Sequence, residues 1–278
     1  MERAADHAVP TGPLAVRWLG FELDPPRAGA LGSARLALEN AGTAPWPPEG
    51  ERRVCLSYHW LDELGNPIVW DGLWTALPGR VEPGQRIEAG LTVRAPIPPG
   101  RYRLAFDLVA EERYWFSELG NAALEREVAV APRIAARALA VHGADEGALV
   151  RLDEPVVPEE EALAIAYLVP GCVPAPDWSR RVLDAHEEGF AAVGGSIEVE
   201  GGLLRRRDPA LEPWAPGRGR VPGFEHPLLC PSFVRELEPD WTEPVAGLPA
   251  LRPPAQEPWV YDGRIVVRAR PRSGRRRG

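Results

Sequence analysis

The chain contains no lysine, so arginine is its only strongly basic residue. Alanine, proline and glycine are abundant as well, a combination that a GC-rich genome explains, so the arginine count by itself carries little functional information. Cysteine is also scarce, and its three copies, Cys55, Cys172 and Cys230, lie far apart along the chain. Without a close pair they indicate neither a disulfide framework nor a four-thiolate zinc site, and we expect free, reduced thiols.

Long hydrophobic runs are missing too. No segment approaches the roughly 18 apolar residues of a membrane-spanning helix, and the opening residues lack the apolar core of a secretion signal. We therefore expect a cytoplasmic protein without a transmembrane segment. The formal charge of -8 and the pI near 5.3 argue against a nucleic-acid partner, because phosphate neutralisation needs a clustered basic face and the one basic run is terminal.

Several signatures of catalysis are absent. The chain has no Gly-x-Ser-x-Gly motif, no Walker loop, and no His-x-x-x-His or Cys-x-x-Cys pair. The glycine-containing run at 217–223 is not a dinucleotide-binding motif, because Pro222 and the spacing do not suit a glycine turn that opens a helix. We expect neither a bound metal nor a cofactor.

Apolar residues make up 45 % of the 278 residues, which is enough for two ordinary hydrophobic cores. Over 14–130 apolar and polar residues alternate with period two, and turn-forming residues interrupt the alternation about every eight to twelve residues. The clearest segments are 35–39, 53–60, 86–94 and 101–108. The pattern predicts an immunoglobulin-like antiparallel β-sandwich in which each strand faces the core on one side and water on the other.

Five residues of this half, Trp46, Pro83, Gly84, Gly100 and Tyr102, carry a family resemblance. They belong to the runs LENAGTAPWPPEG, VEPGQ and VRAPIPPGRYRLAFDL. Together these runs resemble the four-tryptophan immunoglobulin-like domain of autophagy cargo receptors and of many bacterial proteins. The resemblance implies a recognition or spacer module without an active site, and a protein partner that binds through this domain.

Tryptophans are dense in the second part of this domain. Trp70 and Trp74 flank Asp71 in a segment that looks like a turn, which favours an aromatic platform for a sugar ring with Asp71 beside it. The alternative is that these indoles fill the core, as Trp60 would. His59 is predicted to lie on the water-facing side of its strand, where either a metal or acid-base role or a solvated surface position is open.

A different pattern begins after residue 133. Residues 162–169 form a continuous apolar run of strand length, typical of a strand covered on both faces. Asp177 is a favourable N-cap for the helix that follows, and Gly189 is placed to end it. The inner stripe of this helix comprises Trp178, Val182 and Ala185. A short strand after the helix completes a βαβ-like unit, so we expect a small α/β module over 134–262.

The order of elements in this module resembles family-two-type glycosyltransferases of the GT-A fold. The matching flanks are Val173, Pro174, Pro176, Asp177, Trp178, Gly194 and Gly195. In that family an Asp-x-Asp-type cluster coordinates the cation of the nucleotide diphosphate. Pro170, Gly171 and Cys172 occupy those positions here and supply no hard oxygen side chain. The resemblance therefore implies a degenerate module without its metal site, and Trp178 in its flank is a ligand-binding candidate.

Glu225, His226 and Asp240 are the remaining catalytic candidates, because inverting transfer needs a base that deprotonates the acceptor hydroxyl. None of them lies in a matching motif, so we assign no catalytic residue and keep these three as alternatives.

The chain after residue 205 is rich in proline, glycine and tryptophan. We expect an irregular arm that is anchored by Trp214, Trp241 and Trp259. The arginine-rich residues 268–278 are expected to form a mobile tail.

These features predict an α+β multidomain protein that binds or scaffolds without catalysis in bacterial surface-glycan assembly, with a glycan or nucleotide-sugar as its ligand. One alternative is an active glycosyltransferase that is metal-independent or completed by a partner chain. Another is a purely structural interaction protein.

Overall fold

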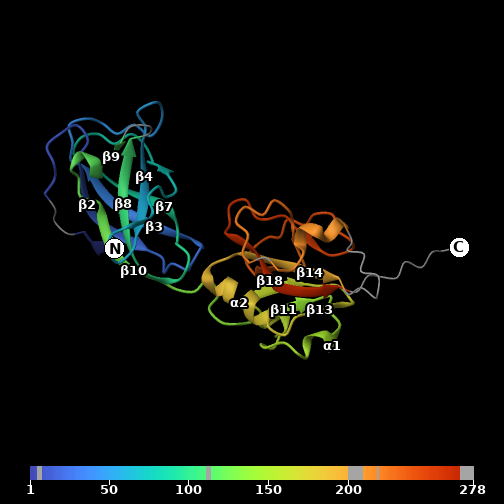
Figure 1. Cartoon of the computed structure of the whole chain (residues 1–278). Coiled ribbons are helices and arrows are strands. Elements are labelled where there is room, and N and C mark those ends of the chain that lie inside the picture. Colours follow the sequence, from blue (N-terminus) through green and yellow to red (C-terminus); the bar gives the residue numbers. More distant parts are fainter. Residues whose placement is uncertain (5–7, 111–113, 200–208, 218, 270–278) are drawn as a thin grey trace. The chain divides into compact units, whose positions relative to one another are not determined.

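The computed structural model describes residues 1–4, 8–110, 114–199, 209–217 and 219–269. The chain divides into two compact units, Met1–Ala131 and Pro132–Gly278, which are described separately (Figure 1). The fold is mostly β, with several antiparallel sheets and a few short helices, and this agrees with an α+β class.

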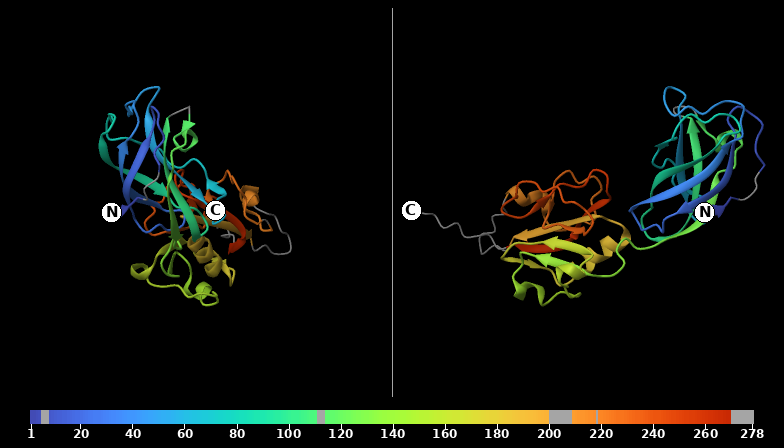
Figure 2. Two further views of the ribbon diagram at one scale, coloured as in Figure 1. Left: turned by 90° about the vertical axis from the view of Figure 1, so that its left-hand side faces the viewer. Right: turned by 180° about the vertical axis from the view of Figure 1, so that it is seen from behind.

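The first unit contains two antiparallel sheets (Figure 2). One sheet holds, in spatial order, β1 (Glu2–Arg3), β2 (Val16–Leu23), β3 (Leu31–Asn40) and β7 (Arg86–Arg94). The main path of the other holds β10 (Leu124–Val130), β8 (Gly100–Ala110), β4 (Val54–Leu61) and β5 (Pro67–Val69). Two short strands extend it: β6 (Thr75–Ala76) pairs with β4, and β9 (Tyr114–Trp115) pairs with β8.

The buried side chains of the two sheets form one hydrophobic core. Leu36 and Leu38 of β3 are fully buried, as the period-two alternation predicts. Trp46 and Trp60 are fully buried too, and the Trp60 indole N–H donates a hydrogen bond to the Arg94 carbonyl at 2.9 Å. Trp60 therefore belongs to the core, and its polar atom is satisfied there.

Strand β4 differs from the prediction that one side of each strand faces water. Cys55, Ser57 and His59 alternate with the core residues, yet they are only 3 %, 0 % and 3 % exposed. The rings of Trp70 and Trp115 lie against His59 and cover this outer side. The prediction that His59 faces water is therefore wrong, because alternation reports the direction of a side chain but not a loop that folds back over the strand.

The second unit is built on a six-stranded mixed sheet. Its strands, in spatial order, are β11 (Leu139–His142), β12 (Ala164–Tyr167), β16 (Ser232–Val234), β14 (Ala192–Val199), β18 (Trp259–Ala269) and β13 (Cys172–Pro174). The pairs β11–β12 and β14–β18 are parallel, and the other neighbours are antiparallel. A separate antiparallel pair consists of β15 (Leu228–Leu229) and β17 (Ala250–Leu251).

Helix α2 (Trp178–Glu188) connects β13 to β14, and its inner stripe of Trp178, Val182 and Ala185 is buried as the sequence predicts. Asp177 is the N-cap residue, but its carboxylate makes no capping bond and instead accepts a hydrogen bond from Arg181 Nε at 2.5 Å. The other described helices are η1 (Ser117–Leu119), α1 (Glu146–Leu149), η2 (Glu159–Glu161) and η3 (Pro209–Trp214). No helix in the described ranges is long and apolar enough to cross a membrane.

The predicted βαβ-like unit is found only in part. Strands β12 and β14 run in the same direction, since both are antiparallel to β16, but β16 lies between them. Helix η3 and the segment that carries β17 lie on one side of the sheet, with α1 on the other (Figure 2). A continuous apolar run identified β12 but gave no information about which strand would pair beside it.

The prediction of an irregular arm after residue 205 needs correction. Strand β16 is central in the sheet, and β18 runs for 11 residues beside β14. Asp262 and Gly263 look like a turn in the sequence, but here they lie at a register shift of the β14–β18 ladder within a continuous strand. Two residues of the predicted tail, Arg268 and Ala269, pair with β13, and 270–278 lie outside the described residues.

The three expected anchors of that arm differ in burial. Trp214 is 3 % exposed and lies in the core of the second unit, and Trp259 is partly buried against the same core. Trp241 is 41 % exposed, although its ring stands edge-on to Tyr167 with centroids 4.9 Å apart. It therefore contributes mainly to the surface of the second unit.

Candidate functional site

Three tryptophans and a histidine gather on the outer side of β4. We name this cluster, which consists of His59, Trp70, Trp74 and Trp115, the tryptophan face. The rings of Trp70 and His59 stack with centroids 4.2 Å apart and an interplanar angle of 18°. Trp115 stands edge-on to Trp70 and Trp74 at 6.3 and 6.4 Å. Because Trp70 and Trp74 are 48 % and 38 % exposed while the other two rings are buried, two indoles face solvent on a buried aromatic base.

Gly72 lets the loop between the two exposed indoles lie flat against β4. Its N–H donates to the Tyr58 carbonyl at 3.0 Å, and a Cβ at this position would lie only 2.6 Å from that oxygen. Any side chain would therefore lift the loop away from the strand. The ends of the loop are fixed as well, because it runs from β5 to β6 and both pair with β4.

His59 holds Trp70 in place from below. Its Nδ1–H donates to the Trp70 carbonyl, since a carbonyl oxygen can only accept. On the other side of the ring, Nε2 lies 3.7 Å from Oδ2 of Asp107, and both residues are buried. The Asp107 carboxylate accepts hydrogen bonds from the N–H groups of Leu108 and Ser117 at 2.7 and 3.2 Å. His59 is thus a positioning residue for the exposed indole.

Asp71 is the polar group beside the two exposed indoles. The Trp74 indole N–H donates to its Oδ1 at 2.5 Å, which orients the Trp74 ring. Asp71 is exposed, so its second carboxylate oxygen can accept hydrogen bonds from hydroxyl groups. The structure therefore brings together Trp70, Asp71 and Trp74, three of the four residues that the sequence suggested for ligand binding.

The fourth residue, Trp178, lies elsewhere. It is 1 % exposed in the core of the second unit, at the first position of α2. Its indole offers no surface to a ligand in this structure, and its position gives the suggested role no support.

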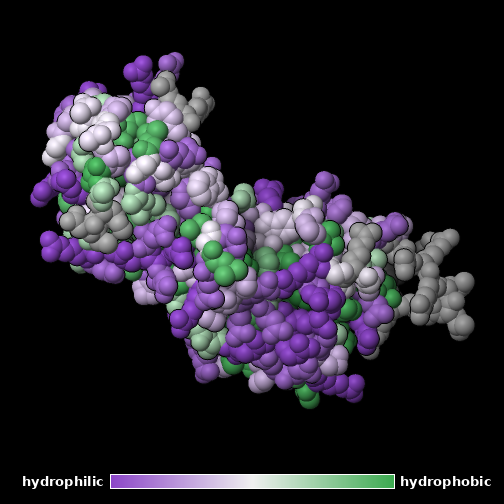
Figure 3. Space-filling view, turned by 60° about the vertical axis from the view of Figure 1, so that its left-hand side comes forward, coloured by the Kyte–Doolittle hydropathy of each residue, from purple (hydrophilic) through white to green (hydrophobic). Residues whose placement is uncertain are grey.

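Exposed apolar side chains continue along the segment that carries Trp70. Leu64, Ile68 and Leu73 are 88 %, 48 % and 40 % exposed. In the view of Figure 3, apolar side chains interrupt the hydrophilic surface of both units. Neighbouring apolar residues of this kind are typical of surfaces that contact a ligand or a partner.

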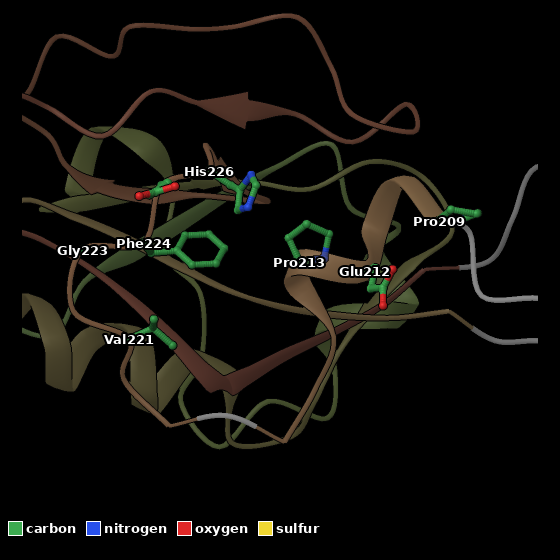
Figure 4. A pocket seen from close by; sticks show the side chains of 8 residues that line it. Pro209, Glu212, Pro213, Val221, Gly223, Phe224 and His226 are labelled. Atoms are coloured by element: carbon green, nitrogen blue, oxygen red, sulfur yellow. The ribbon is translucent and has the colours of Figure 1, made fainter.

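The second unit contains an open cavity of about 510 Å³, and the side chains of Pro213, Phe224 and His226 project toward its centre (Figure 4). The Phe224 ring stacks on Tyr261 at 3.9 Å and 11°. The described lining comprises Pro209, Glu212, Pro213, Val221, Gly223, Phe224, Glu225 and His226. Two catalytic candidates from the sequence, Glu225 and His226, thus share one cavity.

Asp240, the third catalytic candidate, does not belong to the described lining of that cavity. Its carboxylate forms an exposed ion pair with Arg252 at 3.1 Å. The side chain is well solvated there, and we assign it no role in chemistry.

The segment that resembles a transferase metal site has different contacts. Cys172 is 1 % exposed and packs in the core, and the Gly171 N–H donates to Asp145 Oδ2 at 2.9 Å. Within the described ranges, no group of three or more His, Cys, Asp or Glu side chains is arranged to hold a metal ion.

The residues that support the tryptophan face could not be predicted from the sequence. The alternation over 101–108 predicts that Asp107 lies on the water-facing side of its strand. Three strands, β6, β7 and β8, lie between Trp70 and Trp115 in the sequence. Asp107 and Trp115 come close to His59 only because β8 and β9 add to β4 in the same sheet. The one local signal was the unusual density of tryptophan.

Comparisons with known proteins leave the family open. No protein-family model and no curated protein matches the chain. Among solved structures it is similar to the C-terminal domain of wzt, with 9 % identity, a TM-score of 0.31, and coverage of 44 % of this chain and 76 % of that one.

Two hydrolases are also similar. A beta-glucosidase from Listeria innocua has 10 % identity and a TM-score of 0.26, with coverage of 41 % of this chain and 15 % of that one. A family 123 glycoside hydrolase from Clostridium perfringens has 10 % identity and a TM-score of 0.24, with coverage of 63 % and 32 %. The chain spans only a small part of either hydrolase, and TM-scores of this size establish no shared function.

Proposed function

We propose that this chain is a non-catalytic glycan-binding protein and that the tryptophan face holds the sugar. The observation that carries the proposal is the pair of half-exposed indoles, Trp70 and Trp74. The buried ring of His59 stacks on Trp70, and the buried ring of Trp115 stands edge-on to both. The exposed carboxylate of Asp71 lies beside them and already binds the Trp74 indole N–H.

A sugar ring suits this surface for two reasons. The C–H groups on one face of the ring pack on an indole, while its hydroxyl groups donate to a neighbouring carboxylate such as that of Asp71. Because the stacked His59 ring already holds the Trp70 indole, and a hydrogen bond to Asp71 holds the Trp74 indole, little side-chain entropy is lost on binding.

The proposal extends to both units. The first unit is an immunoglobulin-like recognition sandwich of the four-tryptophan type. Trp46 supports this part of the proposal, because it is fully buried and its backbone pairs with that of Val81 in an antiparallel β-bridge. The second is a scaffold derived from a glycosyltransferase-like module, with Cys172 where a metal ligand would be needed. In this role the chain is a binding component of bacterial surface-glycan assembly.

Titration of the full chain with bacterial surface oligosaccharides, followed by calorimetry and tryptophan fluorescence, tests the proposal. Trp70→Ala and Trp74→Ala should each weaken binding about tenfold, or about 1.4 kcal/mol. Trp241→Ala is the matched control, because Trp241 is also half-exposed but belongs to the second unit. The proposal fails if all three variants bind like the wild type, or if no glycan binds. A purely structural protein would give flat titrations throughout.

A second candidate function, sugar transfer, is favoured by the cavity that Glu225 and His226 share. If it is correct, Glu225→Gln and His226→Ala should abolish turnover of a nucleotide-sugar. Asp240→Asn should leave turnover unchanged, because Asp240 forms an exposed ion pair outside the described lining. A wild-type chain that turns over no nucleotide-sugar, with or without Mn²⁺, excludes this candidate.

A further inference from the structure

Two cysteines that are distant in the sequence meet in the second unit. Cys172 is the first residue of β13, and Cys230 lies between β15 and β16. The N–H of Tyr167, at the end of β12, donates to the Pro231 carbonyl at 3.0 Å. The segment around Cys230 therefore runs beside the turn that leads from β12 to Cys172. Both cysteines belong to the same hydrophobic core, where their thiols interact.

The backbone holds both cysteines in place. The Cys172 N–H donates to the Val169 carbonyl, and the Cys230 N–H donates to the Pro249 carbonyl, each at 3.0 Å. Cys230 has a φ of 47°, in the left-handed region that residues other than glycine seldom adopt. The meeting of the two thiols is therefore fixed by specific turns on either side.

The two thiols differ in acidity. Interaction with the Cys230 thiol lowers the pKa of the Cys172 thiol to about 7, although burial acts in the opposite direction. The same interaction, together with burial, raises the pKa of the Cys230 thiol. Near neutral pH, Cys172 thus has a substantial thiolate fraction, while the Cys230 thiol keeps its proton.

We propose that Cys172 and Cys230 form a reversible intramolecular disulfide when the protein meets a hydroperoxide. In the first step the Cys172 thiolate attacks a peroxide oxygen, the O–O bond breaks, and Cys172 becomes a sulfenic acid as hydroxide leaves. In the second step the Cys230 sulfur attacks the sulfenic sulfur, the S–O bond breaks, and the oxygen leaves as water with the Cys230 proton. The two sulfurs lose two electrons in total, and the peroxide accepts them.

The edge position of β13 provides access for the oxidant. β13 has three residues, is last in the order of the sheet, and pairs with β18. Local opening of so short an edge strand exposes Cys172 without unfolding the core. The disulfide would then link β13 to the connection between β15 and β16.

Differential alkylation of the full chain before and after hydrogen peroxide treatment tests the proposal. The reduced protein has three free thiols. Peroxide should leave one, that of Cys55, and lower the intact mass by two hydrogen atoms, and dithiothreitol should restore all three. Mass spectrometry of the non-reduced digest should find the Cys172–Cys230 crosslink.

Cys55→Ser is the matched control, because Cys55 is also buried but belongs to the first unit. This variant should still form the crosslink, whereas Cys172→Ser and Cys230→Ser should not. Three free thiols after peroxide, or sulfinic acid at Cys172 without the crosslink, would overturn the proposal. Should either serine variant fail to fold, the crosslink in the folded wild-type chain decides alone: its presence supports the proposal, and its absence overturns it.

Discussion

His186 shows how strongly one buried side chain can depend on its protonation state. It is fully buried on α2, with Nε2 2.9 Å from Ser232 Oγ and Nδ1 2.8 Å from the Phe190 carbonyl. Burial lowers the pKa of His186 to about 4, the hydrogen bond to Phe190 opposes this shift, and the positive charge of Arg133 adds to it. The folded state therefore requires the neutral imidazole.

Acid should destabilise the second unit through His186. The His186 side chain takes up a proton near pH 6.5 in the unfolded chain but only near pH 4 in the folded chain. The contribution of neutral His186 to stability is therefore fully present above pH 6.5 and is lost as the pH drops toward 4. The loss amounts to about 3 kcal/mol at about 1.4 kcal/mol per pKa unit. Urea unfolding at intervals from pH 7 to 4 measures it. In His186→Asn the slope over this window should flatten, and an unchanged slope would refute the explanation.

Gly72 should be intolerant of a single methyl group. Gly72→Ala would place a Cβ 2.6 Å from the Tyr58 carbonyl, so the loop must shift away from β4 at a cost of about 1–3 kcal/mol. The displaced indoles should also bind glycan more weakly. Gly79→Ala is the control, because a Cβ there meets nothing within 4 Å. Thermal unfolding and glycan titration measure both effects, and equal behaviour of the two variants would count against the steric account.

At the scale of elements, Arg137 joins the chain before β11 to helix α2. Its Nε donates to Glu154 at 2.8 Å and its Nη2 to Asp184 at 2.9 Å, and these contacts raise the Arg137 pKa. Arg137→Ala should lower the free energy of unfolding by about 2 kcal/mol. Arg252→Ala removes only an exposed ion pair and should cost less than about 1 kcal/mol. Denaturant unfolding compares the two, and equal losses would contradict the anchoring role.

Strands and helices with one core face were predictable from the sequence. The alternation identified β3, β4, β7 and β8, and the apolar stripe with Asp177 and Gly189 identified α2. Strands that form only because they pair with a neighbouring strand could not be predicted from the sequence. β16 has only three residues, and β18 contains Asp262 and Gly263, whose bulge exists because β14 pairs on both sides of it.

The candidate sites follow the same division. Trp70, Asp71 and Trp74 are close in sequence, so their meeting could be predicted. The His59–Asp107 contact depends on the pairing of β4 with β8, which no local pattern reports. The Cys172–Cys230 contact depends on where β12, β16 and their connections lie, so the cysteine spacing gave no indication of it.

At the scale of the whole molecule, two units with separate cores should unfold separately. Calorimetry of the full chain should show two transitions, and fragments 1–131 and 132–278 should each reproduce one of them. Lowering the pH from 7 to 5 should reduce the midpoint temperature of the second unit's transition more than that of the first, because His186 lies in the second unit. A single transition, with neither fragment folded alone, would rule out this independence.

The place of β18 in its sheet also constrains how the protein is made. β18 is the last described strand in the sequence, yet it lies between β14 and β13. Until 259–269 leave the ribosome, one edge of β14 stays open and the partner of β13 does not exist. The first unit can complete both of its sheets much earlier. A nascent chain that stalls before β18 would therefore carry a finished first unit and an open β edge that invites aggregation.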